Sequence, residues 1–230
     1  MLSQVDSSIG GKTGVDFDSY KNMVGAFHMP RLVYMNLLAL NTLSKEQFSC
    51  GMGEILKHGL IKNKAYFVWC MENVEKIWAR DYDTLLYMIQ ESCKVKRDVV
   101  EKDPTEKGDR ALLNFGHTLG HAVEKLKNFE MLHGQCVAVG SVAAMKLSAM
   151  RGNICEADVL YVEKCFECFG LPTRIDGLTS KKILEVSKSD KKMEAGKIKF
   201  VLLHDIGNAY VEKNVSDEEL IQATDYLLNC

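Results

Sequence analysis

The sequence predicts a mainly α-helical protein with a small amount of β structure. Three prolines, at positions 30, 104 and 172, occur in 230 residues, and proline is the residue that most strongly interrupts a helix. Between them, apolar residues recur three and four positions apart, which is the period of an amphipathic helix. Patterns typical of strands are confined to the two end regions of the chain.

Composition limits the classes of function. The chain has 47% apolar and 26% charged residues, and 29 basic against 31 acidic side chains give a net charge of −2. No overall positive field attracts nucleic acid or an anionic membrane surface, so a bound anion must be held by local lysines. No apolar run reaches the roughly 18 residues of a membrane-spanning helix, and no signal-peptide pattern opens the chain. We expect a cytoplasmic protein without nucleic-acid or membrane partners.

The first 43 residues are expected to form loops and short strands. They contain the glycine-rich stretches IGGKTG and VGAF, and a β-like run, PRLVYMNLL, begins at Pro30. From Ser44 the pattern becomes helical. Ser44 and Gln47 have the spacing of a capping box, and apolar residues recur at helical spacing from Phe48 to Leu60.

Further helices and a β-hairpin follow in order. Helices are expected near residues 65–79, 83–102, 110–128, 134–151, 156–169 and 179–188. The stretches KIKFVLLH and NAYVEKNV flank an Asp-Ile-Gly turn and predict a β-hairpin. Ser216 and Glu219 have the spacing of a capping box at the start of a last helix.

The eight cysteines are too sparse for a disulfide scaffold. Most of them, such as Cys70 and Cys136, lie within apolar helical patterns, where a reduced thiol packs as a small apolar group. Cys165 and Cys168 form a CxxC pair that has either a packing role or a metal or redox role. The absence of a second pair and the amphipathic context favour packing.

The strongest local signal is the segment NFGHTLGHAVE, residues 114–124. His117 and His121 are four positions apart, so on a helix both imidazoles project from the same face about one turn apart. Gly116 and Gly120 lower the helix propensity, which is better tolerated where another backbone or a ligand approaches closely. Glu124 continues the same side of the helix.

Two further residues can complete a metal site with these histidines. His133, in LHGQCVAVG at a predicted helix start, can fold back toward them, and Glu54, in GMGEILKHG, offers a carboxylate. Two imidazoles and a carboxylate are the ligand set of an open zinc site, which leaves a position for water or a substrate oxygen. Alternatively, each histidine is an ordinary core or surface residue. The combined spacing favours the metal site.

Several basic residues are candidates for binding an anion. Lys96 lies on a mostly apolar helix face with Ile89, Cys93 and Val100. Its ammonium therefore either reaches along that face to water or points into a cleft that takes an anionic substrate. The other candidates are Lys12, Arg110, Lys191 and Lys192. GGKT around Lys12 lacks the full spacing of a phosphate-binding loop.

The chain resembles the 3-dehydroquinate synthase family of sugar phosphate cyclases in six segments. These are, in order, VDSSIGGKTG, YKNMVGAF, GEILKHGLI, RALLNFGHTLGHAVE, LHGQCVAVG and SDKKMEAGKIKFVLL. The resemblance covers nearly the whole chain, and the histidine segment is highly specific. It implies a carbon–oxygen lyase of the shikimate pathway that depends on NAD and on a divalent metal, Zn²⁺ or Co²⁺. Such an enzyme converts 3-deoxy-D-arabino-heptulosonate 7-phosphate into 3-dehydroquinate with loss of phosphate.

The resemblance also implies roles for individual residues. The implied metal ligands are Glu54, His117 and His133. The implied catalytic residues are Lys96 and His121, around the reacting carbons and the carboxylate, together with Arg110 and Asn114. The implied substrate contacts are Lys12, Asp6, Glu106, Lys191 and Lys192, without a choice between the last two. The implied cofactor contacts are Lys21, Asn22 and Thr42.

One departure from the family concerns the nucleotide-binding domain. Family members begin with a large domain of this kind, whereas no strand, glycine turn and helix unit precedes Asp6 and no GxGxxG occurs here. We therefore expect residues 1–43 to be a remnant of an N-terminal NAD-binding α/β domain. Residues 44–230 are expected to form a helical metal- and substrate-binding domain with a C-terminal β-hairpin. The chain alone is expected to bind metal, to bind NAD poorly and either to form homodimers or to take the missing domain from elsewhere.

Other functions are open at this stage. A sibling cyclase would use the same metal ligands on another sugar phosphate, and a non-catalytic helical remnant would bind no metal at all. Metal-dependent alcohol dehydrogenases share the general plan, but their histidine motifs differ from NFGHTLGHAVE, so they rank third.

Overall fold

Helices dominate the computed structural model, which describes residues 1–17, 20–190 and 199–228. The α-helices are α1 (Lys45–Lys62), α2 (Lys64–Glu72), α3 (Val74–Trp78), α4 (Tyr82–Lys102), α5 (His117–Leu126), α6 (His133–Met150), α7 (Glu156–Cys168), α8 (Ser180–Asp190) and α9 (Asp217–Asp225). Shorter helical turns are η1 (Ser3–Ser7), η2 (Leu37–Thr42) and η3 (Asp109–Asn114). Two antiparallel hairpins pair β1 (Val15–Phe17) with β2 (Tyr20–Val24) and β3 (Phe200–Asp205) with β4 (Asn208–Glu212). The predicted mainly helical class is confirmed.

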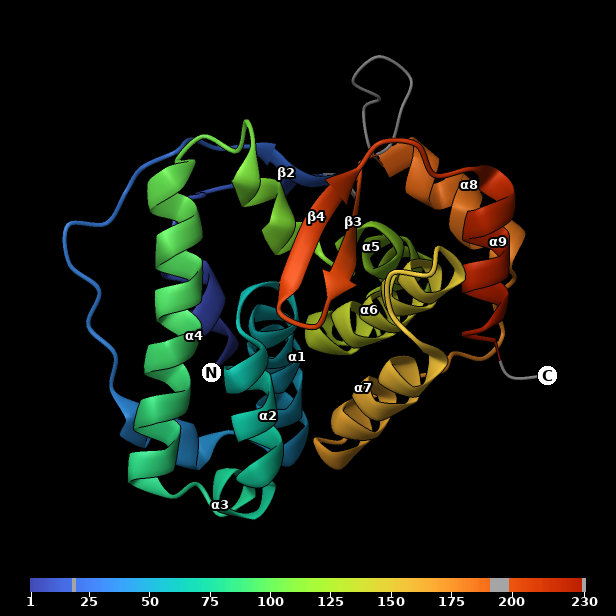
Figure 1. Ribbon diagram of the computed structural model, residues 1–230. Helices are drawn as coiled ribbons and strands as arrows, with labels where there is room; N and C mark the ends of the chain where they lie inside the picture. Colours follow the sequence, from blue (N-terminus) through green and yellow to red (C-terminus); the bar gives the residue numbers. More distant parts are fainter. Residues whose placement is uncertain (18–19, 191–198, 229–230) are drawn as a thin grey trace.

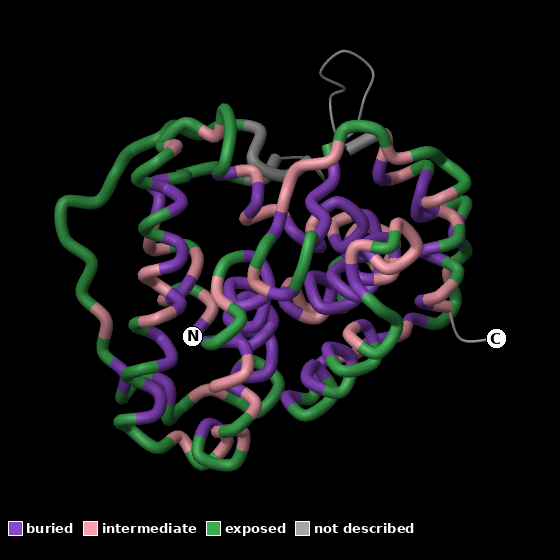
Figure 2. Tube along the Cα trace, viewed as in Figure 1, coloured by how far each residue is buried: buried purple, intermediate pink, exposed green. Residues whose placement is uncertain are grey.

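α6 is the central helix of the fold. It packs against α1 and α5, and the β3–β4 hairpin and α7 contact its other sides (Figure 1). Every residue from Cys136 to Met145 is buried, and most are small: Ala, Gly, Ser or Val (Figure 2). α4 packs on α1, and η1 contacts both of these helices. A helix buried all round is held by tertiary contacts, which fix α1 and α5 on its surface.

Several predicted elements lie where the sequence placed them. α4, α6, α7, α8, α9 and the β3–β4 hairpin agree with the predicted ranges within a few residues. Ser44 accepts a hydrogen bond from the Gln47 backbone N–H at 3.2 Å and begins α1. Ser216 and Glu219 form a reciprocal capping box before α9, with distances of 3.2 and 2.8 Å.

Two predicted helices are each divided. The prediction of one helix over residues 110–128 is wrong, because Gly116 adopts a left-handed conformation with φ of +76° and separates η3 from α5. The prediction over residues 65–79 is wrong in the same way, since α2 ends at Glu72 and α3 begins at Val74. The side chain of Asn73, between them, donates to the Trp69 carbonyl at 2.9 Å, which satisfies a carbonyl of the last turn of α2.

The β-like run at Pro30 does not form a strand. Residues 30–36 have no regular secondary structure, and η2 follows them. Leu32 and Tyr34 are 84% and 85% exposed. A strand needs a neighbouring strand for its backbone hydrogen bonds, and the described part of the chain pairs none with this run.

Among the described residues, no helix combines the length and apolar character that crossing a membrane requires.

Candidate metal centre and cationic cavity

Three helices bring Glu54, His117 and His133 together. Glu54 lies in α1, His117 begins α5 and His133 begins α6. One potential ligand atom from each residue lies within 4.8 Å of the others. The Nε2 atoms of His117 and His133 are 3.4 and 3.5 Å from the same oxygen, Oε1 of Glu54. The predicted convergence of two imidazoles and a distant carboxylate is therefore present.

Glycines allow these helices to meet backbone to backbone. A Cβ atom on Gly134, next to His133, would lie 1.8 Å from the Cys50 carbonyl oxygen of α1. A Cβ atom on Gly140 would lie 1.9 Å from the Gly116 carbonyl oxygen, which directly precedes α5. Because only glycine fits at such distances, α1 and α5 approach α6 closely enough for short side chains to converge.

The donor atoms suit a divalent metal ion. Oε1 of Glu54 is buried and has no hydrogen-bond partner in the described ranges. Nδ1 of His117 lies 3.0 Å from the Phe115 carbonyl oxygen. Nδ1–H is then the donor, and the lone pair of Nε2 faces Glu54. Nδ1 of His133 lies 3.8 Å from Glu124, and such an outer carboxylate orients a metal-binding imidazole.

The charges around the three residues follow from burial and from their neighbours. Burial alone would raise the pKa of the Glu54 carboxyl, but the Lys57 ammonium and the two imidazoles hold that pKa well below its usual range. Burial and Lys57 lower the pKa of His117 well below 6.5, so this imidazole is neutral. Burial opposes the charge of His133, but the carboxylates of Glu124 and Glu54 raise its pKa to about 9. A metal ion must therefore displace a proton from His133.

A cavity of about 350 Å³ opens beside these residues. The residues predicted from the sequence that line this cavity are Asp6, Lys12, Lys96, Arg110, Asn114, His117, His121 and His133. Lys96 is buried, and its ammonium contacts the backbone carbonyl and the carboxylate of Asp6. Of the two alternatives for Lys96, extension along the helix to water is therefore wrong. Burial lowers the pKa of Lys96, although Asp6 opposes that shift.

The rim of the cavity contains a chain of polar contacts. The Lys12 ammonium pairs with Glu106, and Asn114 donates to the other carboxylate oxygen of Glu106 at 2.8 Å. Arg110 is 2% exposed and donates to the carbonyl oxygens of Pro104 and Gly10 at 2.5 and 2.7 Å. These contacts join the first residues of the chain to the loop before α5.

Besides Glu54 and Glu106, which contact residues of the cavity, five predicted site residues are not placed in it. Thr42 ends η2 and is exposed; its hydroxyl donates to the Ala39 carbonyl at 3.1 Å, and it does not line the cavity. Lys21 and Asn22 lie in β2, but their side chains fall outside the described part of the structure. Lys191 and Lys192 also lie outside the described residues; their roles, like those of Lys21, Asn22 and Thr42, stay predictions.

The sequence reasoning missed Lys57. It is 1% exposed, contacts the second oxygen of Glu54 and lines the cavity. The sequence does indicate a contact, because Lys57 lies three residues after Glu54, inside the apolar segment EILKHGLI, and this spacing places both side chains on one helix face.

The CxxC pair packs without forming a site. Cys165 is buried and Cys168 is exposed, and both thiols are free. Burial raises the pKa of Cys165 to about 12, which keeps it protonated and unreactive. The packing interpretation is supported.

Comparison with known proteins shows the family to which the chain belongs. The 3-dehydroquinate synthase C-terminal family matches residues 51–193, and the 3-dehydroquinate synthase N-terminal family matches residues 1–50. The chain belongs to the 3-dehydroquinate synthase family. The 3-dehydroquinate synthase of Acetivibrio thermocellus is 41% identical over 222 residues, and that of Haemophilus ducreyi is 39% identical over 225 residues. These matches cover 96% and 97% of this chain but 62% of each relative.

Solved structures of related cyclases share the fold. A 2-epi-5-epi-valiolone synthase from Streptomyces hygroscopicus, with NAD⁺ and Zn²⁺ bound, superimposes with a TM-score of 0.91 and 25% identity. The match covers 98% of this chain and 63% of that protein. A 2-deoxy-scyllo-inosose synthase complexed with carbaglucose-6-phosphate, NAD⁺ and Co²⁺ gives a TM-score of 0.82 at 22% identity, covering 99% of this chain and 64% of that protein.

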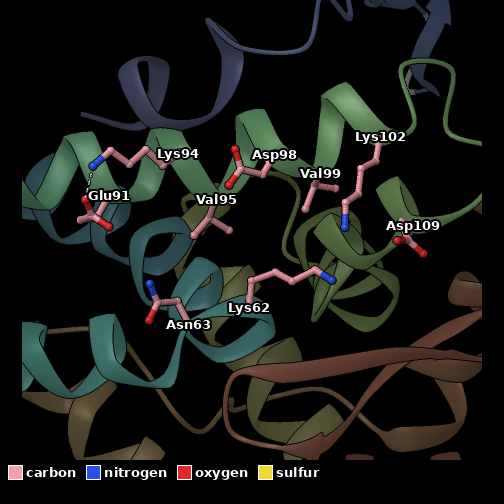
Figure 3. A pocket seen from close by; sticks show the side chains of 9 residues that line it. All are labelled: Lys62, Asn63, Glu91, Lys94, Val95, Asp98, Val99, Lys102 and Asp109. Atoms are coloured by element: carbon pink, nitrogen blue, oxygen red, sulfur yellow. Dashed lines mark hydrogen bonds and ion pairs between the residues drawn. The ribbon is translucent and has the colours of Figure 1, made fainter.

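A second cavity in this 3-dehydroquinate synthase family member is separate from the histidine cluster. It measures about 320 Å³ and lies between the end of α1, α4 and η3 (Figure 3). Lysines and carboxylates are mixed in its lining, for example Lys62, Lys102 and Asp109. None of the predicted site residues lines it.

His58 is expected to make the metal-free chain sensitive to acid. It is fully buried in α1, its Nδ1 lies 2.7 Å from Ser92 Oγ in α4, and burial lowers its pKa to about 3. The unfolded histidine titrates near 6.5. Between these values the unfolded state binds a proton that the folded state does not, so stability falls as the pH falls. At pH 5 the loss from this residue is about 2 kcal/mol.

Urea unfolding of the metal-free chain at pH 7 and pH 5 measures this effect. The His58→Leu variant should lose part of the pH dependence, whereas a matched change of the exposed His204, His204→Leu, should keep it. Equal pH dependence in the wild type and His58→Leu would contradict the assignment.

Proposed function

We propose that this chain carries the metal- and substrate-binding part of a 3-dehydroquinate synthase. That enzyme is a lyase of the shikimate pathway, which eliminates phosphate from 3-deoxy-D-arabino-heptulosonate 7-phosphate and closes the carbon ring to give 3-dehydroquinate. The observation that carries the proposal is the convergence of Glu54, His117 and His133 beside a cavity lined by basic side chains. The names of the curated relatives support it.

Glu54, His117 and His133 would hold a single Zn²⁺ or Co²⁺ ion. One carboxylate and two imidazoles suit zinc and leave a coordination position open. When bound, the ion would act as a Lewis acid toward substrate hydroxyl oxygens. The zinc in the related valiolone synthase supports this assignment.

The remaining side chains would bind and orient the anionic substrate. We assign Lys96 and His121 to the reacting carbons and the carboxylate, where Lys96 stabilises negative charge and a ring nitrogen of His121 exchanges a proton. Arg110, Lys12 and Asn114 are assigned to the phosphate and neighbouring oxygens. Lys12 now pairs with Glu106, and Lys96 with Asp6. The substrate must therefore compete with these carboxylates for both lysines.

NAD, when bound, would oxidise and later re-reduce a substrate alcohol. We propose that residues 1–43 complete the NAD-binding α/β unit and that residues 44–230 form the helical domain. The match of residues 1–50 to the N-terminal family supports this division. The β-like run at Pro30 also supports it, because its apolar side chains Leu32 and Tyr34 are exposed and the run pairs with no strand among the described residues. The chain spans 62% of the length of its curated relatives, and we expect these 230 residues alone to bind NAD weakly and to turn over slowly. Tight NAD binding in calorimetry would contradict this.

A sibling cyclase that acts on another sugar phosphate is the second candidate. The TM-score of 0.91 with the valiolone synthase favours it. Measuring phosphate release from both classes of sugar phosphate, with NAD present, distinguishes the two. Release from the seven-carbon acid phosphate alone would support the first proposal, and release from another sugar phosphate alone would support the second.

Zinc titration tests the metal site itself. The wild-type chain is expected to bind about one Zn²⁺, and the His117→Ala variant to lose that binding. The matched variant His204→Ala should bind zinc like the wild type. If elemental analysis finds no stoichiometric zinc or cobalt in the wild type, the metal site is disproved and the non-catalytic alternative is favoured.

A further inference from the structure

Lys57 is a buried cation whose charge is balanced by Glu54. The two side chains are 1% and 0% exposed, and the ammonium contacts Oε2 of the carboxylate directly. They lie three residues apart on α1, one above the other on the same helix face. Exposed pairs of this spacing contribute little, because water screens them. Here neither charge reaches water, so the Lys57 ammonium depends on Glu54, whereas Glu54 is balanced by Lys57 on one oxygen and faced by His133 on the other.

The two oxygens of Glu54 face different partners. Oε2 contacts Lys57, whereas Oε1 lacks a hydrogen-bond partner among the described residues and faces the Nε2 atoms of His117 and His133. A cation held by Oε1 and the two imidazoles would therefore lie across a single carboxylate group from the Lys57 ammonium. Two positive charges at that separation, away from water, repel each other strongly.

We infer that Lys57 is the counter-ion of Glu54 in the metal-free chain and competes with the divalent cation for that carboxylate. This inference rests on the metal site proposed above. Lys57 keeps Glu54 compensated when no metal is bound, so the chain folds without metal, and its charge lowers the affinity for the ion. When an ion neutralises Glu54, the charge of Lys57 is no longer balanced, and Lys57 already lines the cavity with Lys96 and Arg110. Metal entry therefore makes the cavity more attractive to an anion.

Zinc affinity of charge-altered variants tests the competition. Competition with a chromophoric chelator would compare the wild type with Lys57→Met, which keeps the apolar stem, and Lys57→Arg, which keeps the charge. We expect Lys57→Met to bind Zn²⁺ at least about tenfold more tightly, and Lys57→Arg to stay within about threefold of the wild type. In thermal unfolding, Lys57→Met should destabilise the metal-free form more than the zinc-loaded form.

The outcomes distinguish failure of this inference from failure of the proposed metal site. If the wild type binds zinc and Lys57→Met binds it equally or more weakly, Lys57 merely packs or orients Glu54, and the inference is wrong. If the wild type binds no zinc, the proposed metal site fails and the inference fails with it.

A measurement on the unaltered chain covers the case in which Lys57→Met does not fold. Reductive methylation, followed by mass spectrometry, reports how readily each lysine amine reacts. Lys57 should react several-fold faster after zinc is added, since the ion neutralises the Glu54 carboxylate that holds its ammonium. Lys188, which pairs with Asp217 on the surface, is the control and should react at the same rate in both states. An unchanged or slower rate at Lys57 would overturn the inference.

Discussion

Replacing Gly140 with alanine is expected to destabilise the chain by more than about 3 kcal/mol. The added Cβ would lie 1.9 Å from the Gly116 carbonyl oxygen and 2.8 Å from the Gly120 backbone nitrogen. Both neighbours are backbone atoms, so neither can rotate away as a side chain would. α5 must then move off α6, and it carries His117 with it. We therefore also expect Gly140→Ala to weaken zinc binding.

A second methyl-sized change on α6 provides the control. Ala149→Gly, near the end of the helix at a partly buried position, should cost about 1 kcal/mol through helix propensity. Urea unfolding of both variants without metal measures the difference. If Gly140→Ala costs no more than Ala149→Gly, close packing of α5 on α6 is not required.

Replacing Glu54 with glutamine is expected to have the largest effect on the metal site. The change is isosteric but removes the anionic ligand, so zinc affinity should fall by more than the roughly 10- to 100-fold typical of losing an outer partner. It also leaves the Lys57 ammonium buried without a carboxylate, which should lower the stability of the metal-free chain by about 3–5 kcal/mol.

Glu106→Gln is the matched control for this change. Glu106 contacts Lys12 and Asn114 at the rim but is not one of the three proposed metal ligands, Glu54, His117 and His133. Isothermal titration with Zn²⁺ should therefore give near wild-type affinity for Glu106→Gln. Similar losses in both variants would show that general charge, rather than ligation, governs zinc binding.

Helix positions were predictable because local signals agree with the tertiary packing. Capping residues such as Ser44 and Ser216 and the regular apolar spacing fix where helices begin and which face is buried. The break at Gly116 was not predictable in this way. Its cause is the approach of α6, whose residues Val137 and Ser141 leave no room for a Cβ atom at Gly116.

The residues of the proposed metal site were predictable for a different reason. His117 and His133 lie near glycines in an unusual local pattern, and family resemblance connects that pattern to Glu54. Lys57 was harder to find, because an isolated sequence does not distinguish a lysine paired inside the protein from one that reaches water. The β-like run at Pro30 was wrongly predicted to be a strand. Strand propensity does not show whether a neighbouring strand is available for pairing.

The position of η1 has a consequence for how the two predicted regions depend on each other. Val5 is fully buried, Asp6 contacts the Lys96 ammonium, and Gly10 accepts a hydrogen bond from Arg110. A shortened chain starting at Ser44 would leave Lys96 without its carboxylate and Arg110 without one of its two carbonyl acceptors. Polar contacts therefore connect residues on the two sides of the proposed border at residue 43. Lys96 and Arg110 of the helical region depend on Asp6 and Gly10 of the preceding segment to balance or solvate their charges.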